Sequence, residues 1–287
     1  MLIFFFLAGS GAIATFFLGN FHVTFEWVWL PFLLTFIYFW ALYLVWLLLM
    51  ALFSFGVNRH KGKEYKPNRF AMWVLSETCF ILLILFRVRF HATGMGKVPD
   101  PKTKFMLVSN HLSGFDHVGL ISLFVKHKMV CVSKRGNEKF ILASGWIKKA
   151  GYLSIDQGNV LSGTAVIEKA GRYIAEDVCS VCIAPEGTRN KSFPEPELLP
   201  FHPGSFQMAY QSHCPIVVFA IQNTNAIFKR FPLRPTDVYF DCVGVIEYED
   251  YKSLTPAELA NKARGMIERR FEQKRARFYH FKPKAKQ

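Results

Sequence analysis

Residues 27–57 are uncharged, in one of the longest uncharged stretches of this 287-residue chain. A helix needs about 20 apolar residues to cross the hydrocarbon core of a bilayer, and this stretch is longer than that. Trp27 and Trp29 lie at one end of it, as expected for aromatic rings at a membrane surface. We therefore predict a membrane-spanning helix, and the rest of the chain must be organised around a bilayer.

Two further apolar segments lie on either side of this helix. Residues 1–19 carry no charge, lack the basic start of a signal peptide and are followed by no clean cleavage site, so we expect them to be retained. They would form a hairpin with residues 27–57. Residues 70–86 carry only Glu77 and either span the membrane or, as we favour, lie in its cytoplasmic leaflet. Residues 1–90 are thus predicted to be a helical membrane anchor.

The charge of the chain indicates its orientation and its partners. The net charge is +14, and residues 58–69 (NRHKGKEYKPNR) hold five Lys or Arg and one Glu. Basic loops stay on the cytoplasmic side, so we predict an integral membrane protein whose C-terminal domain faces the cytoplasm. Nucleic acid would also suit a basic chain, but it does not explain the apolar first 90 residues, and we expect none. The basic residues 256–287 are either a solvated helix and tail or an adhesion site for anionic lipids.

Residues 91–255 alternate short apolar runs with helical patterns. The predicted strands are 105–109, 130–133, 152–155, 179–184, 215–221 and 238–246. The predicted helices are 117–127, 138–149, 159–176 and 203–212, and a further helix at 256–277 follows this segment. Continuously apolar strands that alternate with helices favour an α/β domain with a mostly parallel, covered sheet. We expect residues 91–104 to be a hinge between the anchor and this domain.

The six cysteines indicate neither disulfides nor a metal site. Cys179 and Cys182 form a CxxC, but they lie in a predicted strand, where residues three apart point to opposite faces. They would make a poor chelate, so we expect buried, reduced thiols. No nucleotide-binding glycine loop is evident, and we expect neither a metal nor a tightly bound cofactor.

The segment SNHLSGFDHVG, residues 109–119, follows a predicted strand and concentrates polar groups. His111 and Asp116 would be about 140° apart on a regular helix, so they can meet only through a turn at Ser113 and Gly114. One interpretation makes Asp116 the N-cap of helix 117–127 and His111 a loop residue. The other makes them a dyad in which the carboxylate orients an imidazole that accepts a proton from a substrate hydroxyl.

The segment IAPEGTRNKS, residues 183–192, follows another predicted strand. Gly187 would let the backbone bend or approach a ligand. Arg189 offers a planar fork that suits phosphate. The alternative is a charged turn with an internal pair between Glu186 and Arg189.

The two segments together resemble the hallmarks of a known family. HLSGFD fits the His-x4-Asp motif of the glycerophospholipid acyltransferases, and EGTR fits their second motif, in the same order and at similar spacing. Residues 132–156, 201–209 and 214–221 resemble further blocks of that family. The chain therefore resembles the 1-acyl-sn-glycerol-3-phosphate (lysophosphatidic acid) acyltransferases over roughly residues 85–246.

This resemblance implies an enzyme of phospholipid biosynthesis that moves a fatty acyl group from an acyl thioester to lysophosphatidic acid, giving phosphatidic acid. The co-substrate would be acyl-CoA or acyl carrier protein, with no other cofactor. His111 would be the general base, and Asp116 would orient it. The substrate-binding residues would be Lys134, Glu186, Gly187, Thr188 and Arg189, with Glu186 on the acceptor hydroxyls and with Arg189 and Lys134 on the phosphate.

Two positions depart from the family pattern. Gln157 stands where the family often has an arginine, and His202 stands where a lysine or arginine is common. Both changes remove positive charge, so another lysolipid or amphipathic acceptor is an alternative. A non-catalytic membrane adaptor is a further alternative, which the intact motifs disfavour.

Overall fold

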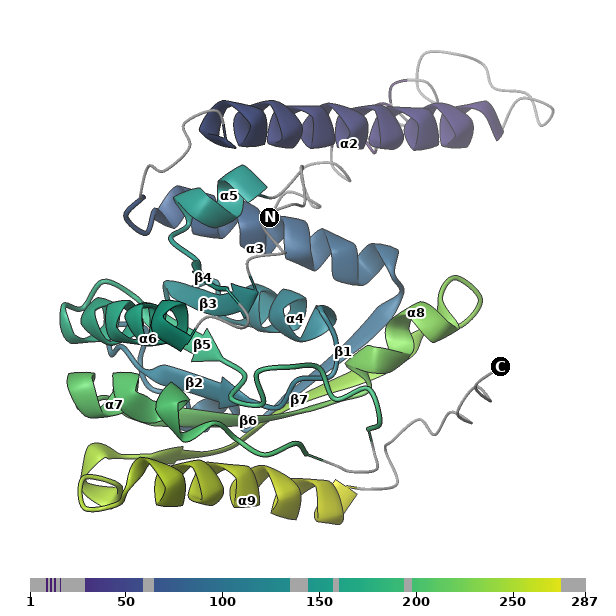
Figure 1. The fold of residues 1–287 in the computed structure, drawn as a ribbon. Coiled ribbons are helices and arrows are strands. Elements are labelled where there is room, and N and C mark those ends of the chain that lie inside the picture. Colours follow the sequence, from purple (N-terminus) through teal and green to yellow (C-terminus); the bar gives the residue numbers. More distant parts are fainter. Residues whose placement is uncertain are drawn as a thin grey trace, which may run out of the picture. The chain divides into compact units, whose positions relative to one another are not determined.

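The computed structural model describes residues 9, 11, 13, 16, 29–58, 65–134, 144–156, 160–193 and 198–274 (Figure 1). Contacts divide the chain into two compact units. The first contains residues 1–64 and 138–148, and the second contains residues 65–137 and 149–287.

The first unit contains the predicted membrane helix. Helix α2 runs from Trp29 to Asn58, and its segment Leu33–Val57 is long and apolar enough to cross a membrane, with a mean hydropathy of 2.3. Only four residues of the predicted hairpin partner, 1–19, fall within the described part of the chain.

A short helix in the same unit packs against α2. Helix α5 runs from Ser144 to Lys149. The Trp146 ring stacks on Phe53 with centroids 3.9 Å apart, and its Nε1 donates to the Met50 carbonyl at 3.1 Å. A β-carbon at Gly145 would lie 2.4 Å from Cα of Ser54, so the close approach of the two helices requires glycine there.

Helix α3, Arg69–Leu85, belongs to the second unit. The Asn68 side chain caps it by accepting from the Ala71 amide at 3.0 Å. One face, which includes Val74 and Leu83, is buried. Because this buried face packs with the α/β domain, the boundary between the units lies at residue 64. We predicted that the anchor ends at residue 90.

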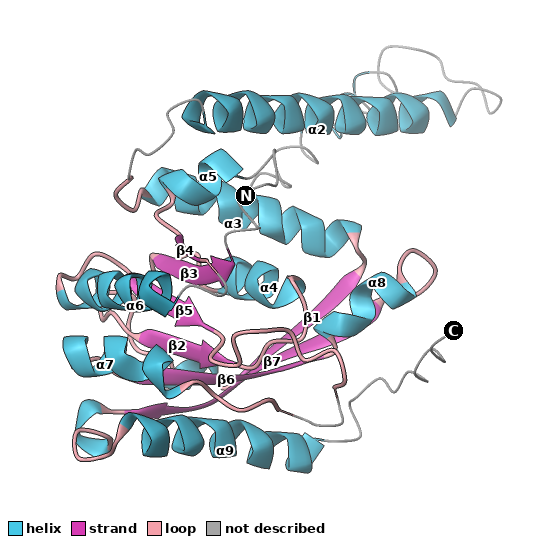
Figure 2. Ribbon diagram, viewed as in Figure 1, coloured by secondary structure: helices cyan, strands magenta, loops and turns pink. Residues whose placement is uncertain are grey.

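The second unit contains a seven-stranded sheet of order β1-β7-β6-β2-β5-β3-β4 (Figure 2). The strands are β1 Val88–Thr93, β2 Met106–Ser109, β3 Met129–Lys134, β4 Leu153–Ile155, β5 Ser180–Ile183, β6 Ile216–Gln222 and β7 Thr236–Ile246. Strands β6, β2, β5, β3 and β4 are mutually parallel, whereas β7 runs antiparallel to β6 and pairs in parallel with β1. The predicted mostly parallel α/β sheet is confirmed.

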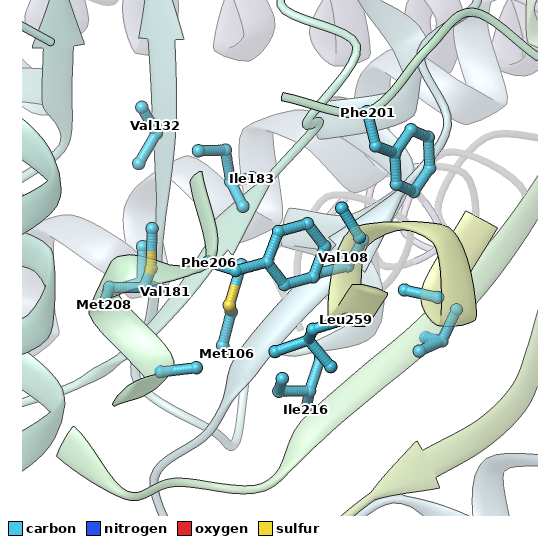
Figure 3. Packing of buried hydrophobic residues seen from close by; sticks show 14 of the residues in the cluster. Met106, Val108, Val132, Val181, Ile183, Phe201, Phe206, Met208, Ile216 and Leu259 are labelled. Carbon is cyan, nitrogen blue, oxygen red and sulfur yellow. The ribbon is translucent and has the colours of Figure 1, made fainter. Parts of the chain in front are cut away.

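Helices cover both faces of this sheet. Helices α6 (Val160–Ala175), α7 (Gln207–Ser212) and α9 (Pro256–Lys274) cover one face, and α3 and α4 (Phe115–Leu123) cover the other (Figure 1). Met106 and Val108 point into the first core, which Figure 3 shows, and Leu107 points into the second. Burial on both faces explains why the strands are continuously apolar. The shorter elements are η2 Met95–Lys97, η4 Pro203–Phe206, η5 Thr224–Ala226, α8 Ile227–Arg230 and η6 Tyr248–Asp250.

Two predictions about the ends of this domain differ from the structure. Residues 91–93, which we expected in a hinge, belong to the edge strand β1. Helix α9, which we assigned to a separate basic tail, is part of the domain. Its side chains Leu259, Ala263, Ile267 and Phe271 are fully buried in the core. Residues 275–287 of that tail lie outside the described residues.

The predicted opposite orientation of Cys179 and Cys182 is confirmed. Cys179 lies in one core of the sheet and Cys182 in the other, so the two thiols point to opposite faces. All six cysteines are free and buried.

Candidate active site

Four parallel strands bring the candidate residues to one edge of the sheet. Strand β2 leads into His111, β3 ends at Lys134, β5 leads into Glu186, and β6 leads into Thr224. These strands are neighbours in the sheet and run in the same direction (Figure 2). Ligands of open α/β sheets gather at such carboxyl ends.

Asn110 fixes the point at which the chain leaves β2. Its side chain is fully buried, with Nδ2 donating to the Ile221 carbonyl at 3.0 Å and Oδ1 accepting from the Ile221 amide at 2.8 Å. The amide side chain thus continues the pairing of β2 with β6 and holds the next residue, His111, in place. We did not select Asn110 from the sequence, although an asparagine at the end of an apolar strand is a usable signal.

The structure brings His111 and Asp116 together through the predicted turn. The His111 Nδ1 lies 2.7 Å from Oδ2 of Asp116. The same oxygen accepts from the amides of Leu112 at 2.7 Å and Ser113 at 2.8 Å. The buried Thr224 hydroxyl donates a short hydrogen bond to Oδ1. Four donors therefore hold a carboxylate that is only 2% exposed, and they fix the plane of the imidazole.

Asp116 is not an N-cap, which was one of the two interpretations of its position in the sequence. Helix α4 begins at Phe115, its N-cap is Gly114, and Asp116 lies in the first turn. Its carboxylate reaches back to the amides of the preceding turn and to His111, where it also lies close to the positive end of the helix. Thr224 was not selected from the sequence, because a residue 108 positions away gives no local signal.

The loop after β5 holds the backbone of His111. Oε1 of Glu186 accepts from the His111 amide at 2.9 Å, and the Asn190 amide donates to the His111 carbonyl at 2.7 Å. Oε2 of Glu186 accepts from the Leu199 amide at 3.3 Å. Gly187 has a φ of +66°, so the turn between Glu186 and Asn190 favours glycine.

Glu186 occupies a different place from the predicted one. We expected its carboxylate to contact substrate hydroxyls or to pair with Arg189. It is 3% exposed, and both oxygens accept from backbone amides. Burial raises its pKa to about 7, against the opposing effect of the two amide donors. Its position is that of a support for His111.

A cavity of about 1150 Å³ opens beside His111. Of the predicted residues, His111, Lys134, Gly187, Thr188 and Arg189 line it, whereas Asp116 and Glu186 lie behind its wall. Lys191 adds a third cation to the lining, and a β-carbon at Gly114 would lie 3.7 Å from Nη2 of Arg189. The guanidinium is therefore next to the turn that joins His111 to Asp116. The cavity extends along α6 and α7 past Ile167, Thr164, Glu168, Gln207 and Tyr210.

Two further histidines line this cavity. The ring of His117 lies 5.3 Å from that of His111, between centroids. Burial, followed by the charges of His111 and Arg189, lowers the pKa of His117 to about 4, so its imidazole is neutral at physiological pH. His202 lies beside Gly187. Gln157, the other departure from the family pattern, lies outside the described residues.

Comparison with known proteins finds similarity over the segment that carries this site. Residues 89–222 match the family model described as Acyltransferase. The chain is similar to the acyltransferase family over that segment. The enzyme is 24% identical to 1-acyl-sn-glycerol-3-phosphate acyltransferase alpha of Mus musculus over 225 residues, which cover 76% of this chain and 74% of the relative. It is 28% identical to 1-acyl-sn-glycerol-3-phosphate acyltransferase of Limnanthes douglasii over 152 residues, 52% of this chain and 53% of the relative. The chain thus matches about half of the length of that plant protein.

A solved structure supports the fold of this acyltransferase. The crystal structure of the 1-acyl-sn-glycerophosphate acyltransferase PlsC from Thermotoga maritima matches 81% of this chain and 98% of its own length. The TM-score is 0.57 and the sequence identity 17%. The two proteins therefore share a fold.

Proposed function

We propose that this acyltransferase moves a fatty acyl group from an acyl thioester to the free hydroxyl of lysophosphatidic acid, producing phosphatidic acid and a free thiol. The observation that carries the proposal is the 2.7 Å contact between Nδ1 of His111 and the buried Asp116 carboxylate, at the wall of a cationic cavity. The donor is acyl-CoA or acyl carrier protein.

The proposed mechanism needs no nucleophile from the protein. Asp116 accepts a hydrogen bond from Nδ1–H of His111, so Nε2 of His111 is left to accept a proton. As the acceptor oxygen attacks the thioester carbonyl carbon, its proton passes to Nε2. The tetrahedral intermediate then collapses, the carbon–sulfur bond breaks, and the thiolate takes the proton back from Nε2. The imidazole is thereby regenerated, and an ester replaces the thioester.

The cations of the cavity would bind the phosphate of the acceptor. Arg189, Lys134 and Lys191 line the same space as His111. A guanidinium makes paired, charge-assisted hydrogen bonds to phosphate oxygens, and lysines add positive charge. Gly187 and Thr188 line the same wall and would contact the acceptor.

The membrane supplies the acceptor in this proposal. Helix α2 would anchor the enzyme as an integral membrane protein with its catalytic domain on the cytoplasmic side, and basic surface would contact anionic lipids. We also propose that no metal or other cofactor takes part, since the thioester is already activated and His111 carries the proton. Turnover should then be unchanged by a metal chelator.

Another lysolipid is the second candidate acceptor. The carboxylates of Asp156 and Glu168 line the cavity together with the cations, and His202 provides no fixed charge there. A zwitterionic headgroup could use both signs of charge, which favours a lysophospholipid with an amine or choline.

An acceptor panel with one fixed donor tests the proposal. The enzyme should release thiol fastest with lysophosphatidic acid and should form phosphatidic acid. His111→Ala should reduce turnover by about 10²–10⁴-fold, the usual contribution of a general base. Faster turnover with lysophosphatidylcholine or lysophosphatidylethanolamine would favour the second candidate. An undiminished rate for His111→Ala would refute the base assignment with any acceptor.

A further inference from the structure

The segment after β6 exposes large apolar side chains on the α/β unit. Phe228, Phe231 and Leu233 are 69%, 40% and 85% exposed. They lie in α8 and the turn that follows it, residues 227–234 (IFKRFPLR), which we name the aromatic-basic loop. Figure 1 shows this loop projecting from the unit near β1. Large apolar groups clustered at an exposed tip indicate a surface that contacts an apolar phase.

This loop is held in place from beneath. Ile227 is fully buried, and the ring of Phe86 lies 5.4 Å from that of Phe228 and 4.7 Å from that of Phe231. The Arg87 guanidinium donates to the Pro232 carbonyl at 2.8 Å, and Nε of Arg230 donates to the Pro235 carbonyl at 3.0 Å. The apolar side chains are therefore presented on a supported backbone, so ordering them on contact costs little entropy.

Basic residues surround the exposed apolar groups. Lys229 and Arg234 are exposed and Arg230 is half-buried within the loop, with the exposed Arg87 beside it. No acidic residue occurs between residues 224 and 236. Aromatic and aliphatic groups flanked by cations match the interface of an anionic bilayer, where the rings enter the headgroup region and the cations meet lipid phosphates. A second copy of the same surface would place cations against cations, which disfavours self-association.

The aromatic-basic loop is connected directly to the active site. The ring of Phe228 lies 5.2 Å from that of Phe115, the residue before Asp116. Thr224, which bonds Asp116, begins the short helix that leads into α8. A surface that contacts lipid at this loop would therefore hold the wall of the catalytic site close to the membrane.

We propose that the aromatic-basic loop is a second membrane-contact site, which inserts Phe228, Phe231 and Leu233 into the interface of an anionic bilayer. It acts in addition to the α2 anchor, because a membrane-spanning helix tethers a domain without fixing which face of that domain meets the lipid. The loop orients the catalytic edge of the sheet toward the leaflet that holds an amphipathic acceptor. This inference is independent of which lysolipid the enzyme acylates.

Depth-dependent quenching on the full chain tests this proposal. Leu233→Cys, carrying an environment-sensitive fluorophore, is reconstituted in vesicles that contain lipids with a nitroxide on the acyl chain. The control is Asn261→Cys, labelled in the same way, on the exposed face of α9. All six native cysteines are buried, so labelling is directed to the new thiol. We expect quenching at position 233 to exceed that at 261 several-fold, and to be stronger in phosphatidylserine-rich vesicles than in phosphatidylcholine vesicles.

Reversing the charge of two basic residues in the loop tests whether anionic lipid is needed for the contact. Lys229→Glu combined with Arg234→Glu, in the Leu233→Cys background, should reduce quenching toward the level at 261. Equal quenching at positions 233 and 261 would overturn the proposal. A blue-shifted but unquenched label at 233 would also overturn it, because protein rather than lipid would then cover the loop. Acyl transfer is assayed on the same samples, so a failure of the proposed function is seen separately from a failure of docking.

Discussion

Two buried carboxylates contact His111, and they do so in different ways. Asp116, 2% exposed, bonds the imidazole and accepts from two amides and a hydroxyl. Glu186, 3% exposed, bonds the amides of His111 and Leu199. The Asp116 carboxylate orients the imidazole ring that transfers the proton. The Glu186 carboxylate holds the backbone of His111. Similar burial therefore gives two roles, and changes at the two sites should differ in kind.

The largest effect is expected from Asp116→Asn. The amide cannot stabilise the imidazolium as a carboxylate does, and it can hold the wrong tautomer of His111. We expect kcat to fall by about 10²–10⁴-fold, with a much smaller change in KM for the acceptor. Thiol release measured at saturating donor checks this.

The control for this variant is Asp177→Asn, at a carboxylate that is 77% exposed and away from the cavity. It should retain the wild-type rate. If Asp116→Asn also retained it, the ring-orienting role of Asp116 would be wrong.

A change in the loop after β5, which carries Arg189, should affect acceptor binding more than turnover. Arg189→Ala removes the guanidinium beside the catalytic turn, and charge-assisted hydrogen bonds are worth about 1.5–3 kcal/mol. We expect KM for a phosphate-bearing acceptor to rise by about 10–100-fold while kcat changes little. Arg172→Ala, an exposed arginine in the last turn of α6, is the matched control. A fall in kcat with unchanged KM would place Arg189 in the chemical step instead.

Much of the fold and of the candidate site can be predicted from the sequence, because short local patterns encode them. The apolar strands, the five-residue spacing of His111 and Asp116 and the glycine turn at Gly187 are all encoded over a few residues. The contacts of side chains that link distant segments are not encoded in any short stretch of sequence. Thr224 reaches Asp116 from another strand, and Asn110 pairs with Ile221, so only the sheet order reveals them. Strand β1 was missed because it is an edge strand with exposed polar residues, which lacks the continuous apolar run of its neighbours.

Thr224 gives a finer test of how Asp116 is held. Thr224→Val preserves shape but removes the hydroxyl that donates to Oδ1. We expect kcat to fall about tenfold, equal to about 1.4 kcal/mol, which is near the value of one hydrogen bond. Thr224→Ser keeps the donor and should restore most of the rate.

A purely structural role for Thr224 predicts something different. It would lower the melting temperature and leave the pH dependence of kcat unchanged. A positioning role requires that Thr224→Val alter the pH–rate profile, because the carboxylate that orients His111 is less well held. Identical profiles for the valine and serine variants would contradict it.

The smallest effect on turnover is expected from Glu186→Gln, whose change should appear in stability instead. Burial raises the folded pKa of Glu186 to about 7 from an ordinary 4.5. Between these values the folded state holds more protons than the unfolded state, so this group lowers stability as pH rises toward 7. The full difference is worth about 3 kcal/mol, and glutamine does not titrate. The melting temperature of the variant relative to wild type should therefore increase from about pH 5 to about pH 8, by up to about 10 °C. Thermal unfolding in detergent at several pH values measures this, with Glu176→Gln on the exposed surface as the control. A difference that stays constant with pH would mean that the Glu186 carboxylate is ionised throughout, and the contrast with Asp116 would then lie in their hydrogen-bond partners alone.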